Sequence, residues 1–335
     1  MTSPRVSVLI AAYNAAAFLQ PTLDSVLDQT FGDLEVLVVD DGSRDDTAGV
    51  VRRAMAADPR VRVIVQENRG LSATRNVGLR ASHGELVAFL DHDDLWHPDK
   101  LAAQVALLDA DPRTAVVSCY SALIDEHQRC LGWLFGGDAN GDVYDEMLVW
   151  DVVSGGSVAL VRRAALDAAG PFDESLAIRE DWDMWIRLAR RHRFATVPRV
   201  LVGYTRMPAN ASRDYERLAD EGVRVLAKVR RDDPSFDEAR HRFCLARDLF
   251  ATASFCAVDG RTGLAWHYLG RSLALTPWPV LRSPRRLALV GVLALRTVLP
   301  AALFTPIFRA LNRLSFQLDP GRPFRELGGP DEPRR

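Results

Sequence analysis

The chain has 335 residues, 48% of which are hydrophobic, and a formal net charge of −2 at pH 7. This composition is typical of a globular protein with a sizeable core, and the near-neutral charge excludes a strongly basic nucleic-acid-binding protein. The four cysteines lack CxxC spacing, which excludes zinc-finger and haem-attachment patterns, so we expect reduced, buried thiols in a cytoplasmic protein. The N-terminus lacks a basic region ahead of a long apolar run, so we expect no secretory signal peptide.

In the first third of the chain, short apolar runs alternate with segments in which apolar residues recur at helical spacing. The apolar runs predict strands at 6–10, 35–39, 61–65 and 86–90. The intervening segments predict helices at 18–27, 47–57, 71–81 and 100–108. Such alternation is typical of βαβ units, so the expected fold class is α/β, with a mostly parallel, Rossmann-like sheet and flanking helices.

The next part of the chain continues the pattern less regularly. It predicts strands at 115–118, 158–161 and 196–204 and helices at 164–168 and 180–191. Residues 125–157 are rich in Gly, Asp and Trp and show no clear periodicity. Long unpatterned segments inside a domain are usually functional loops, so we expect this segment to shape a substrate site.

The pattern changes near Ser212. Residues 215–275 have helical spacing throughout, and their small residues predict a packed helical hairpin that resembles a single tetratricopeptide-like unit. We therefore divide the chain into four parts. These are a first domain at 1–212, a helical extension at 213–280, an apolar and basic helical tail at 281–318, and a disordered end at 319–335.

Within the tail, residues 287–308 are long enough to span a bilayer, but Arg296 and Pro300 disfavour a plain span. Arginines on both sides of this segment suit an anionic membrane surface. Two interpretations stay open. The tail contacts a membrane peripherally, for example at the inner face of the plasma membrane, or it packs on the N-terminal domain.

Acidic residues follow the second and fourth expected strands, with Asp41 after one and Asp91 and Asp93 after the other. Residues two apart on an extended chain point the same way, so Asp91 and Asp93 are expected to face one site. Carboxyl ends of neighbouring strands form the ligand crevice of an open α/β sheet, and carboxylate oxygens suit a Mg²⁺ or Mn²⁺ ion that carries a diphosphate. The alternative is an acidic loop in which Asp94 or Asp99 stabilises the start of the next helix.

Five motifs follow one another at a characteristic spacing. They are Val8–Asn14, Glu35–Ser43 with Asp46-Thr47, Asn68-Arg69-Gly70 leading to Arg75-Asn76 and Gly78, Asp91-His92-Asp93, and Glu180-Asp181-Trp182. As an ordered set they resemble the family 2 glycosyltransferases of the GT-A fold, over about residues 4–210. The resemblance implies an inverting transfer of a sugar from a nucleoside-diphosphate sugar to an acceptor hydroxyl, with Mn²⁺ or Mg²⁺ as cofactor.

The resemblance also implies roles for single residues. Asp93 would be the direct metal ligand, with Asp91 assisting. The residues expected to bind the nucleotide-sugar are Ala12, Tyr13, Asp41, Arg75, Asp91 and His92. Among them, Asp41 would accept a hydrogen bond from the base, and His92 is expected to point away from the two acids along the strand.

Some of these roles have plainer alternatives. Asp41 could belong to an Asp-Gly turn, and Arg75 could be a solvated helix charge. Many relatives carry a histidine that completes the metal site after the segment that corresponds to Tyr204. This chain has Arg206 and Met207 there, so the third metal ligand is left open.

For catalysis, Asp181 is the candidate general base, since the acceptor hydroxyl must lose a proton as it attacks the sugar. Glu180 is the second candidate for this role. The alternative is that both acids stabilise a helix N-terminus. Trp185 is expected in the core, whereas Trp182 beside the acids could stack on a sugar ring.

The expected acceptor is a glycan or a lipid-linked molecule in cell-surface polysaccharide or glycolipid synthesis, and no nucleic-acid partner is expected. Two rival functions are less consistent with the sequence. A sugar-nucleotidyltransferase would carry a Gly-rich loop after the first strand to hold a triphosphate. This chain has Ala-Ala-Tyr-Asn-Ala there, at residues 11–15, which disfavours that function. A catalytically silent glycan-binding or scaffold domain is disfavoured by the intact Asp41, Asp93 and Asp181.

Overall fold

A computed structural model describes residues 3–205, 213–277, 290–291, 294 and 324. The chain divides into two compact units, and each is described by itself. The first contains the described residues 3–147, 151–205 and 324, and the second contains 148–150 and the described residues from 213 to 294. The predicted domain boundary near Ser212 lies outside the described residues.

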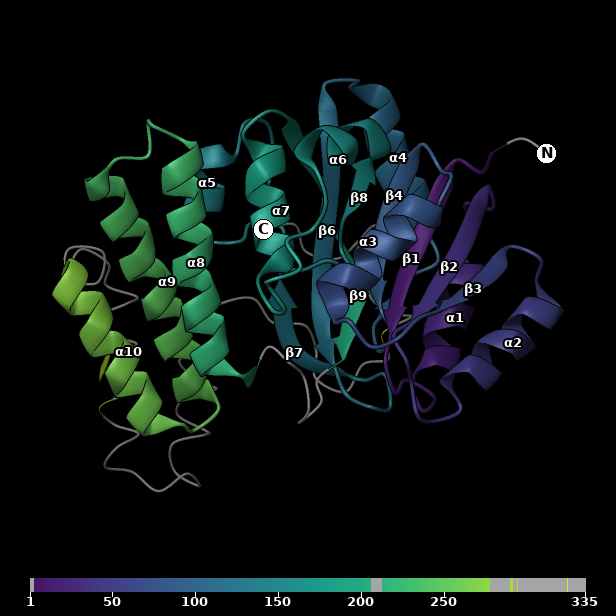
Figure 1. Cartoon of the computed structure of the whole chain (residues 1–335), viewed down its shortest axis with the longest axis horizontal. Helices are drawn as coiled ribbons and strands as arrows, with labels where there is room; N and C mark the ends of the chain where they lie inside the picture. The colour runs from purple at the N-terminus through teal and green to yellow at the C-terminus, as the bar shows by residue number, and fades with distance from the viewer. Residues whose placement is uncertain (1–2, 206–212, 278–289, 292–293, 295–323, 325–335) are drawn as a thin grey trace. The chain divides into compact units, whose positions relative to one another are not determined.

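The first unit is built on a single nine-stranded mixed sheet with the order β3-β2-β1-β4-β8-β6-β9-β5, and β7 pairs with β6 (Figure 1). The strands are β1 (Val6–Ala12), β2 (Leu34–Asp40), β3 (Val61–Val65), β4 (Leu86–Asp91), β5 (Leu95–Trp96), β6 (Thr114–Ile124), β7 (Cys130–Phe135), β8 (Leu160–Arg162) and β9 (Arg193–Thr205). Strands β1 to β4 pair in parallel, as do β6 and β9. Strand β8 runs antiparallel to both of its neighbours, β4 and β6.

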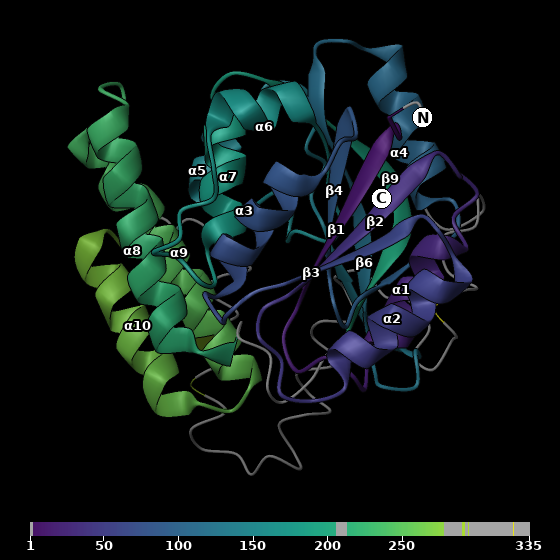
Figure 2. The same cartoon turned by 45° about the vertical axis from the view of Figure 1, so that its right-hand side comes forward.

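Helices cover both faces of this sheet. They are α1 (Leu19–Leu27), α2 (Thr47–Ala57), α3 (Leu71–Ala81), α4 (Lys100–Ala110), α5 (Tyr144–Val149), α6 (Arg163–Ala169) and α7 (Glu180–Ala189). Figure 2 shows α3, α6 and α7 on one side of the sheet and α1, α2 and α4 on the other. The backbone N–H of Leu101 in α4 donates to Gln29, just after α1, at 3.0 Å, which is consistent with this arrangement.

Burial on both faces explains the sequence of the central strands. Every residue of β2 is buried, as are all residues of β6, so these strands read as continuous apolar runs with few polar interruptions. Trp185 of α7 is fully buried against the core, where its ring lies 6.5 Å from that of Phe89. The expectation that Trp185 is a core residue is therefore confirmed.

Most predicted elements occur where expected, with α2, β3 and α3 at the predicted bounds. The α/β class with flanking helices and C-terminal helices is confirmed. The segment 125–157, which was expected to lack regular structure, contains β7 and α5. Strand β6 is also much longer than the predicted 115–118.

The second unit contains α8 (Tyr215–Asp232), α9 (Glu238–Val258) and α10 (Thr262–Leu275). Asp214 caps α8 and Asp237 caps α9, each accepting a backbone N–H from the first turn of its helix. The hydroxyl of Ser272 on α10 donates to the carbonyl of Ala246 on α9 at 2.7 Å, and both residues are buried in the predicted hairpin. Its tetratricopeptide-like character stays a prediction.

The predicted tail at 281–318 and the expected disordered end lie almost wholly outside the described residues. Phe324 is an exception, and it is buried beside Tyr120 and Ile124 of β6, with its N–H bonded to the carbonyl of Gln128. Within the described ranges, no helix has the length and hydropathy needed to cross a membrane.

Candidate functional site

The candidate site lies where three parallel strands end. Strand β1 ends at Ala12, and the N–H of Asp41, just past β2, donates to the Ala12 carbonyl at 2.8 Å. A ring nitrogen of His92, just past β4, lies 3.3 Å from the Ala11 carbonyl of β1. Ala12 is buried and Tyr13 is 42% exposed. The structure therefore brings these predicted donor-binding residues to one edge of the sheet, as expected for an open α/β fold.

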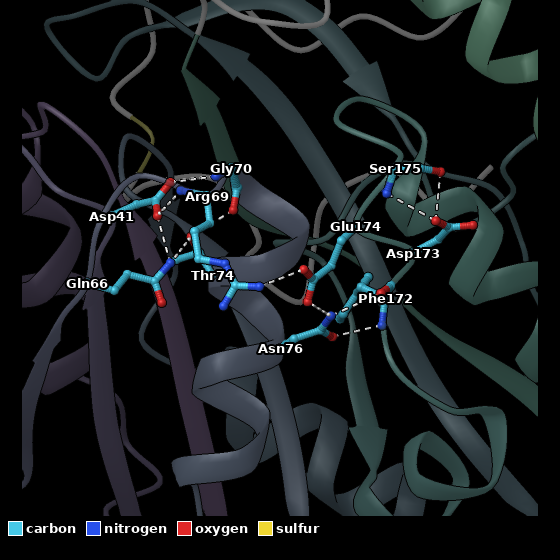
Figure 3. A network of polar contacts seen from close by, with 10 residues as sticks. All are labelled: Asp41, Gln66, Arg69, Gly70, Thr74, Asn76, Phe172, Asp173, Glu174 and Ser175. Atoms are coloured by element: carbon cyan, nitrogen blue, oxygen red, sulfur yellow. Dashed lines mark hydrogen bonds and ion pairs between the residues drawn. The ribbon is translucent and has the colours of Figure 1, made fainter.

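Asp41 is 4% exposed and its carboxylate is bonded within the chain (Figure 3). Oδ1 accepts from the Gln66 amide at 2.7 Å and from the Arg69 backbone N–H at 2.9 Å. Oδ2 accepts from the Gly70 N–H at 2.8 Å. Gly70 has φ +86°, a left-handed conformation that glycine adopts without strain. Asp41 therefore anchors the loop that leads into α3, and base recognition by Asp41 stays a prediction.

Helix α3 connects this loop to the segment that precedes α7 (Figure 3). The Asn76 side chain donates to the Phe172 carbonyl at 3.0 Å and accepts the Phe172 N–H at 2.8 Å. It also donates to Glu174, which pairs with Arg69 at 3.1 Å. The exposed Arg69–Glu174 pair adds little stability, whereas the buried Asn76 bonds fix the approach to α7.

The acidic motif after β4 is arranged differently from the expectation. Strand β4 ends at Asp91, and His92 and Asp93 form a turn, so the argument from alternation along a strand is wrong for Asp93. Asp94 is 1% exposed and accepts the Thr205 N–H of β9 at 3.1 Å. Its carboxylate therefore joins the segment after β4 to β9 and does not cap the following helix. The N-cap residue of that helix is Asp99, whose side chain makes no capping hydrogen bond. Burial and the neighbouring acids raise the pKa of Asp94 well above its ordinary value.

Asp91 and Asp93 are the residues that could hold a cation. No cluster of three or more His, Cys, Asp or Glu side chains suited to a metal occurs in the described part of the chain. Mg²⁺ is commonly bound by one or two carboxylates together with substrate phosphates and water, so a pair of acids fits an ion that arrives with a diphosphate. Oδ1 of Asp91 accepts a hydrogen bond from Arg75, so Oδ2 is the Asp91 oxygen that this ion pair does not use. The segment from Arg206, which would contain a third ligand, lies outside the described residues.

Arg75 of α3 is 4% exposed, so its interpretation as a solvated helix charge is wrong. Its Nη2 donates to Asp91 Oδ1 at 2.8 Å, and its Nη1 donates to Glu180 Oε1 at 2.6 Å. The guanidinium also lies near the rings of Phe89 and Phe172. Nucleotide contact by Arg75 stays a prediction.

The two candidate bases stand at the first turn of α7. Glu180 is 3% exposed; burial raises its pKa, and Arg75 opposes this shift. Asp181 is half-buried, and its Oδ1 accepts the Trp182 N–H at 2.7 Å. Burial raises the pKa of Asp181, whereas Arg75 lowers it. Trp182 is 1% exposed, with its indole N–H donated to the Met147 carbonyl, so the idea that it stacks on a sugar is wrong.

Sequence reasoning missed Asp151. Its carboxylate accepts the N–H groups of Val153 at 2.9 Å and Gly155 at 3.1 Å, which folds the loop that carries Ser157. Burial, with a further contribution from the charge of Asp181, raises the pKa of Asp151 to about 7. The residue stands four positions before the Gly155-Gly156 pair, and a loop-capping acid ahead of two glycines is the signal that could have found it.

Ser157 links this loop to the acidic motif. Its hydroxyl accepts the Asp91 N–H at 3.1 Å, and its carbonyl accepts the Trp96 indole N–H at 2.9 Å. A small pocket opens here, lined by Asp91, Asp94, Ser121, residues 154–158, Val202 and Tyr204. The loop that contains Gly155 and Gly156 and the C-terminal parts of β4 and β9 therefore enclose a small pocket beside Asp91.

Comparison with known proteins identifies the domain. Residues 7–167 match the model described as Glycosyl transferase family 2. These residues form a glycosyl transferase family 2 domain. The chain is 30% identical over 192 residues to the uncharacterized glycosyltransferase RT0329 of Rickettsia typhi, with 56% of this chain and 59% of the relative covered. It is 31% identical over 186 residues to the chondroitin synthase of Escherichia coli, with 56% and 26% covered. The match thus spans less than two thirds of either relative.

Solved structures of this type share the fold. The mannosyltransferase PcManGT from Pyrobaculum calidifontis, in complex with GDP-Man and Mn²⁺, aligns with a TM-score of 0.55 and 26% identity, over 89% of this chain and 88% of that one. S. aureus TarS 1–349 in complex with UDP-GlcNAc aligns with a TM-score of 0.60 and 19% identity, over 88% and 87%. The GT-A fold predicted from the sequence is therefore confirmed.

Proposed function

We propose that this chain transfers a sugar from a nucleoside-diphosphate sugar to an acceptor hydroxyl, with inversion at the anomeric carbon and with Mn²⁺ or Mg²⁺. One observation carries the proposal. Asp91 and Glu180, the first residues of the two acidic motifs, bind the same buried guanidinium of Arg75, although they are far apart in the sequence. The complex of PcManGT with GDP-Man and Mn²⁺ supports both the donor class and the metal.

In the proposed reaction, Asp93 and Asp91 would hold the divalent ion, which when bound would supply Lewis-acid stabilisation of the diphosphate leaving group. The acceptor oxygen forms a bond to the anomeric carbon while the bond from that carbon to the diphosphate oxygen breaks on the opposite face. Asp181 takes the acceptor proton as general base. The pKa of Asp181 is raised by burial, so its carboxylate is a stronger base than that of an exposed aspartate.

Glu180 is less suited to that role. Its Oε1 is occupied by Arg75 at 2.6 Å, and the residue is almost fully buried. A base must reach the substrate hydroxyl within hydrogen-bonding distance, and the half-buried Asp181 offers more access. We therefore assign the base to Asp181 and keep Glu180 as a neighbour that positions it.

The acceptor and the cellular location belong to the proposal as well. We favour a glycan or lipid-linked acceptor in cell-surface polysaccharide synthesis, a class that the chondroitin synthase relative supports by its name. We place the protein in the cytoplasm, with peripheral membrane contact through the basic and apolar tail. We expect no nucleic-acid partner.

The test is a thermal-shift screen of UDP-, GDP- and dTDP-sugars with and without Mn²⁺, followed by donor hydrolysis assays. A donor that binds the folded state raises the melting temperature, and Mn²⁺ should be required. Asp93→Ala should abolish the Mn²⁺-dependent shift and the hydrolysis, whereas Asp46→Ala, a change at an exposed acid, should retain both. No shift and no hydrolysis with any donor for the wild type would refute the proposal in favour of a silent domain.

A further inference from the structure

The Arg75 guanidinium joins three segments of the first unit that are distant in the sequence. Arg75 comes from α3, Asp91 from the end of β4 and Glu180 from the first turn of α7. The two ion pairs use different nitrogens, Nη2 for Asp91 at 2.8 Å and Nη1 for Glu180 at 2.6 Å. Charge-assisted bonds of this kind are strong and directional, so one side chain fixes the distance between two carboxylates.

The surroundings of the guanidinium leave it little freedom. Its Cζ lies 5.8 Å from the ring centre of Phe89 and 5.6 Å from that of Phe172. A Cβ added at Gly156 would come within 2.9 Å of Nη2, so the glycine loop also closes on it. Arg75 is 4% exposed in this enclosure. Such a side chain is held in one orientation and has little surface left for a nucleotide.

The positive charge of Arg75 compensates the negative charges of the carboxylates around it. Asp91, Glu180 and Asp181 all act electrostatically on its guanidinium. The second oxygen of Glu180 is buried without a hydrogen-bond partner among the described residues, so the ion pair with Arg75 is its principal compensation. An uncompensated buried carboxylate is costly, and it would move away from its site or take up a proton.

We propose that Arg75 is a positioning residue that ties the donor-side carboxylate Asp91 to the acceptor-side pair Glu180 and Asp181, and that it is not a contact to the nucleotide. The inference rests on the proposed function, because it assigns Asp91 to the cation and Asp181 to the base. Arg75 then keeps the base on α7 at a set distance from the diphosphate site. Misplacement of a reacting group by about 1 Å can lower the rate about 100-fold.

The experiment is a double-mutant cycle in the full chain, with Arg75→Met, Glu180→Gln and the combined variant. Arg80→Met serves as the matched control, because Arg80 is exposed in the last turn of the same helix. The first readout is thermal unfolding without ligand. We expect Arg75→Met to lower the melting temperature by about 10 °C, because it leaves a buried carboxylate unpaired. The combined variant should regain at least half of that loss, because glutamine carries no charge.

The second readout separates positioning from ligand contact. With metal chelated, the Kd of UDP and GDP for Arg75→Met should stay within about threefold of wild type, while Mn²⁺-dependent donor hydrolysis should show kcat lowered about 100-fold. A metal-free Kd raised tenfold or more, not restored by Glu180→Gln, would overturn the inference in favour of a nucleotide contact. Failure of the combined variant to regain stability would also overturn it.

Two further outcomes are informative. If Arg75→Met does not fold, a folded combined variant supports the ion-pair role, and an unfolded one refutes it. If wild type hydrolyses no donor, the proposed function fails, whereas the unliganded stability cycle still decides whether Arg75 compensates Glu180. The two failures are therefore distinguishable.

Discussion

Asp41→Asn tests whether Asp41 holds its loop together in addition to any contact with a base. The carboxylate accepts three hydrogen bonds, two on Oδ1 and one on Oδ2. Asparagine is similar in size but has one acceptor oxygen and one donor NH₂ group. Its oxygen can keep the bonds from Gln66 and Arg69, in weaker, neutral form. Its NH₂ group then faces the Gly70 N–H, donor against donor, so the third bond is lost.

The magnitude follows from these contacts. A hydrogen bond to a charged group contributes about 1.5–3 kcal/mol, roughly twice a neutral one. Loss of one such bond and weakening of two others should lower the free energy of unfolding by about 3 kcal/mol. This value allows for the exposure of the loop around residues 67–70, where water replaces part of the lost bonding. For a domain of this size, about 3 kcal/mol corresponds to a fall in melting temperature of about 6–12 °C.

The assay is thermal unfolding of the unliganded protein, with Asp46→Asn as control. Asp46 carries the same charge close by in the sequence, but its side chain is exposed and paired only at the surface with Arg53. We expect the control to change the melting temperature by less than about 2 °C. An unchanged melting temperature for Asp41→Asn, together with lost donor binding, would refute the loop-anchoring argument and leave base recognition as the role of Asp41.

Three further predictions concern the site. Asp181→Asn should lower kcat by about 10²–10⁴-fold while the donor-induced thermal shift persists, and a kcat near wild type would exclude Asp181 as the base. Gly156→Ala should lower kcat, because the added Cβ would lie 2.9 Å from Arg75 Nη2. The control Gly32→Ala should leave kcat unchanged, because its Cβ would meet no described atom within 4 Å. Equal activities of the two variants would contradict the enclosure of Arg75. The folded state holds the Asp151 proton to about pH 7, whereas the unfolded chain releases it near about pH 4. Wild type therefore binds more protons when folded, and its free energy of unfolding should fall between about pH 4 and 7 relative to Asp151→Asn. Parallel urea midpoints for the two proteins over this range would refute the raised pKa.

Sequence patterns predicted most helices and strands of the first unit, because the bounds of these elements depend on residues that are neighbours in the chain. Helix α2 ends at Ala57, just before Asp58-Pro59, and β3 is a β-branched run bounded by polar residues. By contrast, β7 and α5 were missed because their sequences show no sustained period. Their structure depends on neighbours, such as the pairing of β7 with the longer β6.

The site divides in the same way. That acids stand at the ends of β2 and β4 is a property of the sequence, since the periodicity alone places those ends. The hydrogen-bond partners of each acid cannot be read from the sequence. Asp41 bonds to Gly70 and Asp94 bonds to Thr205, and only tertiary packing brings these residues together. An arginine on a helix likewise looks solvated until its surroundings are known.

By itself, the sequence determined most strands and helices of the first unit and the positions of the acidic motifs, because each depends on residues close together in the chain. The tertiary structure decided which side chains are buried and what they bind. In the structure, β8 lies antiparallel between β4 and β6, and the Arg75 guanidinium lies between Asp91 and Glu180. Burial removes water as a partner, so the charge of each group is balanced by whatever the fold brings beside it.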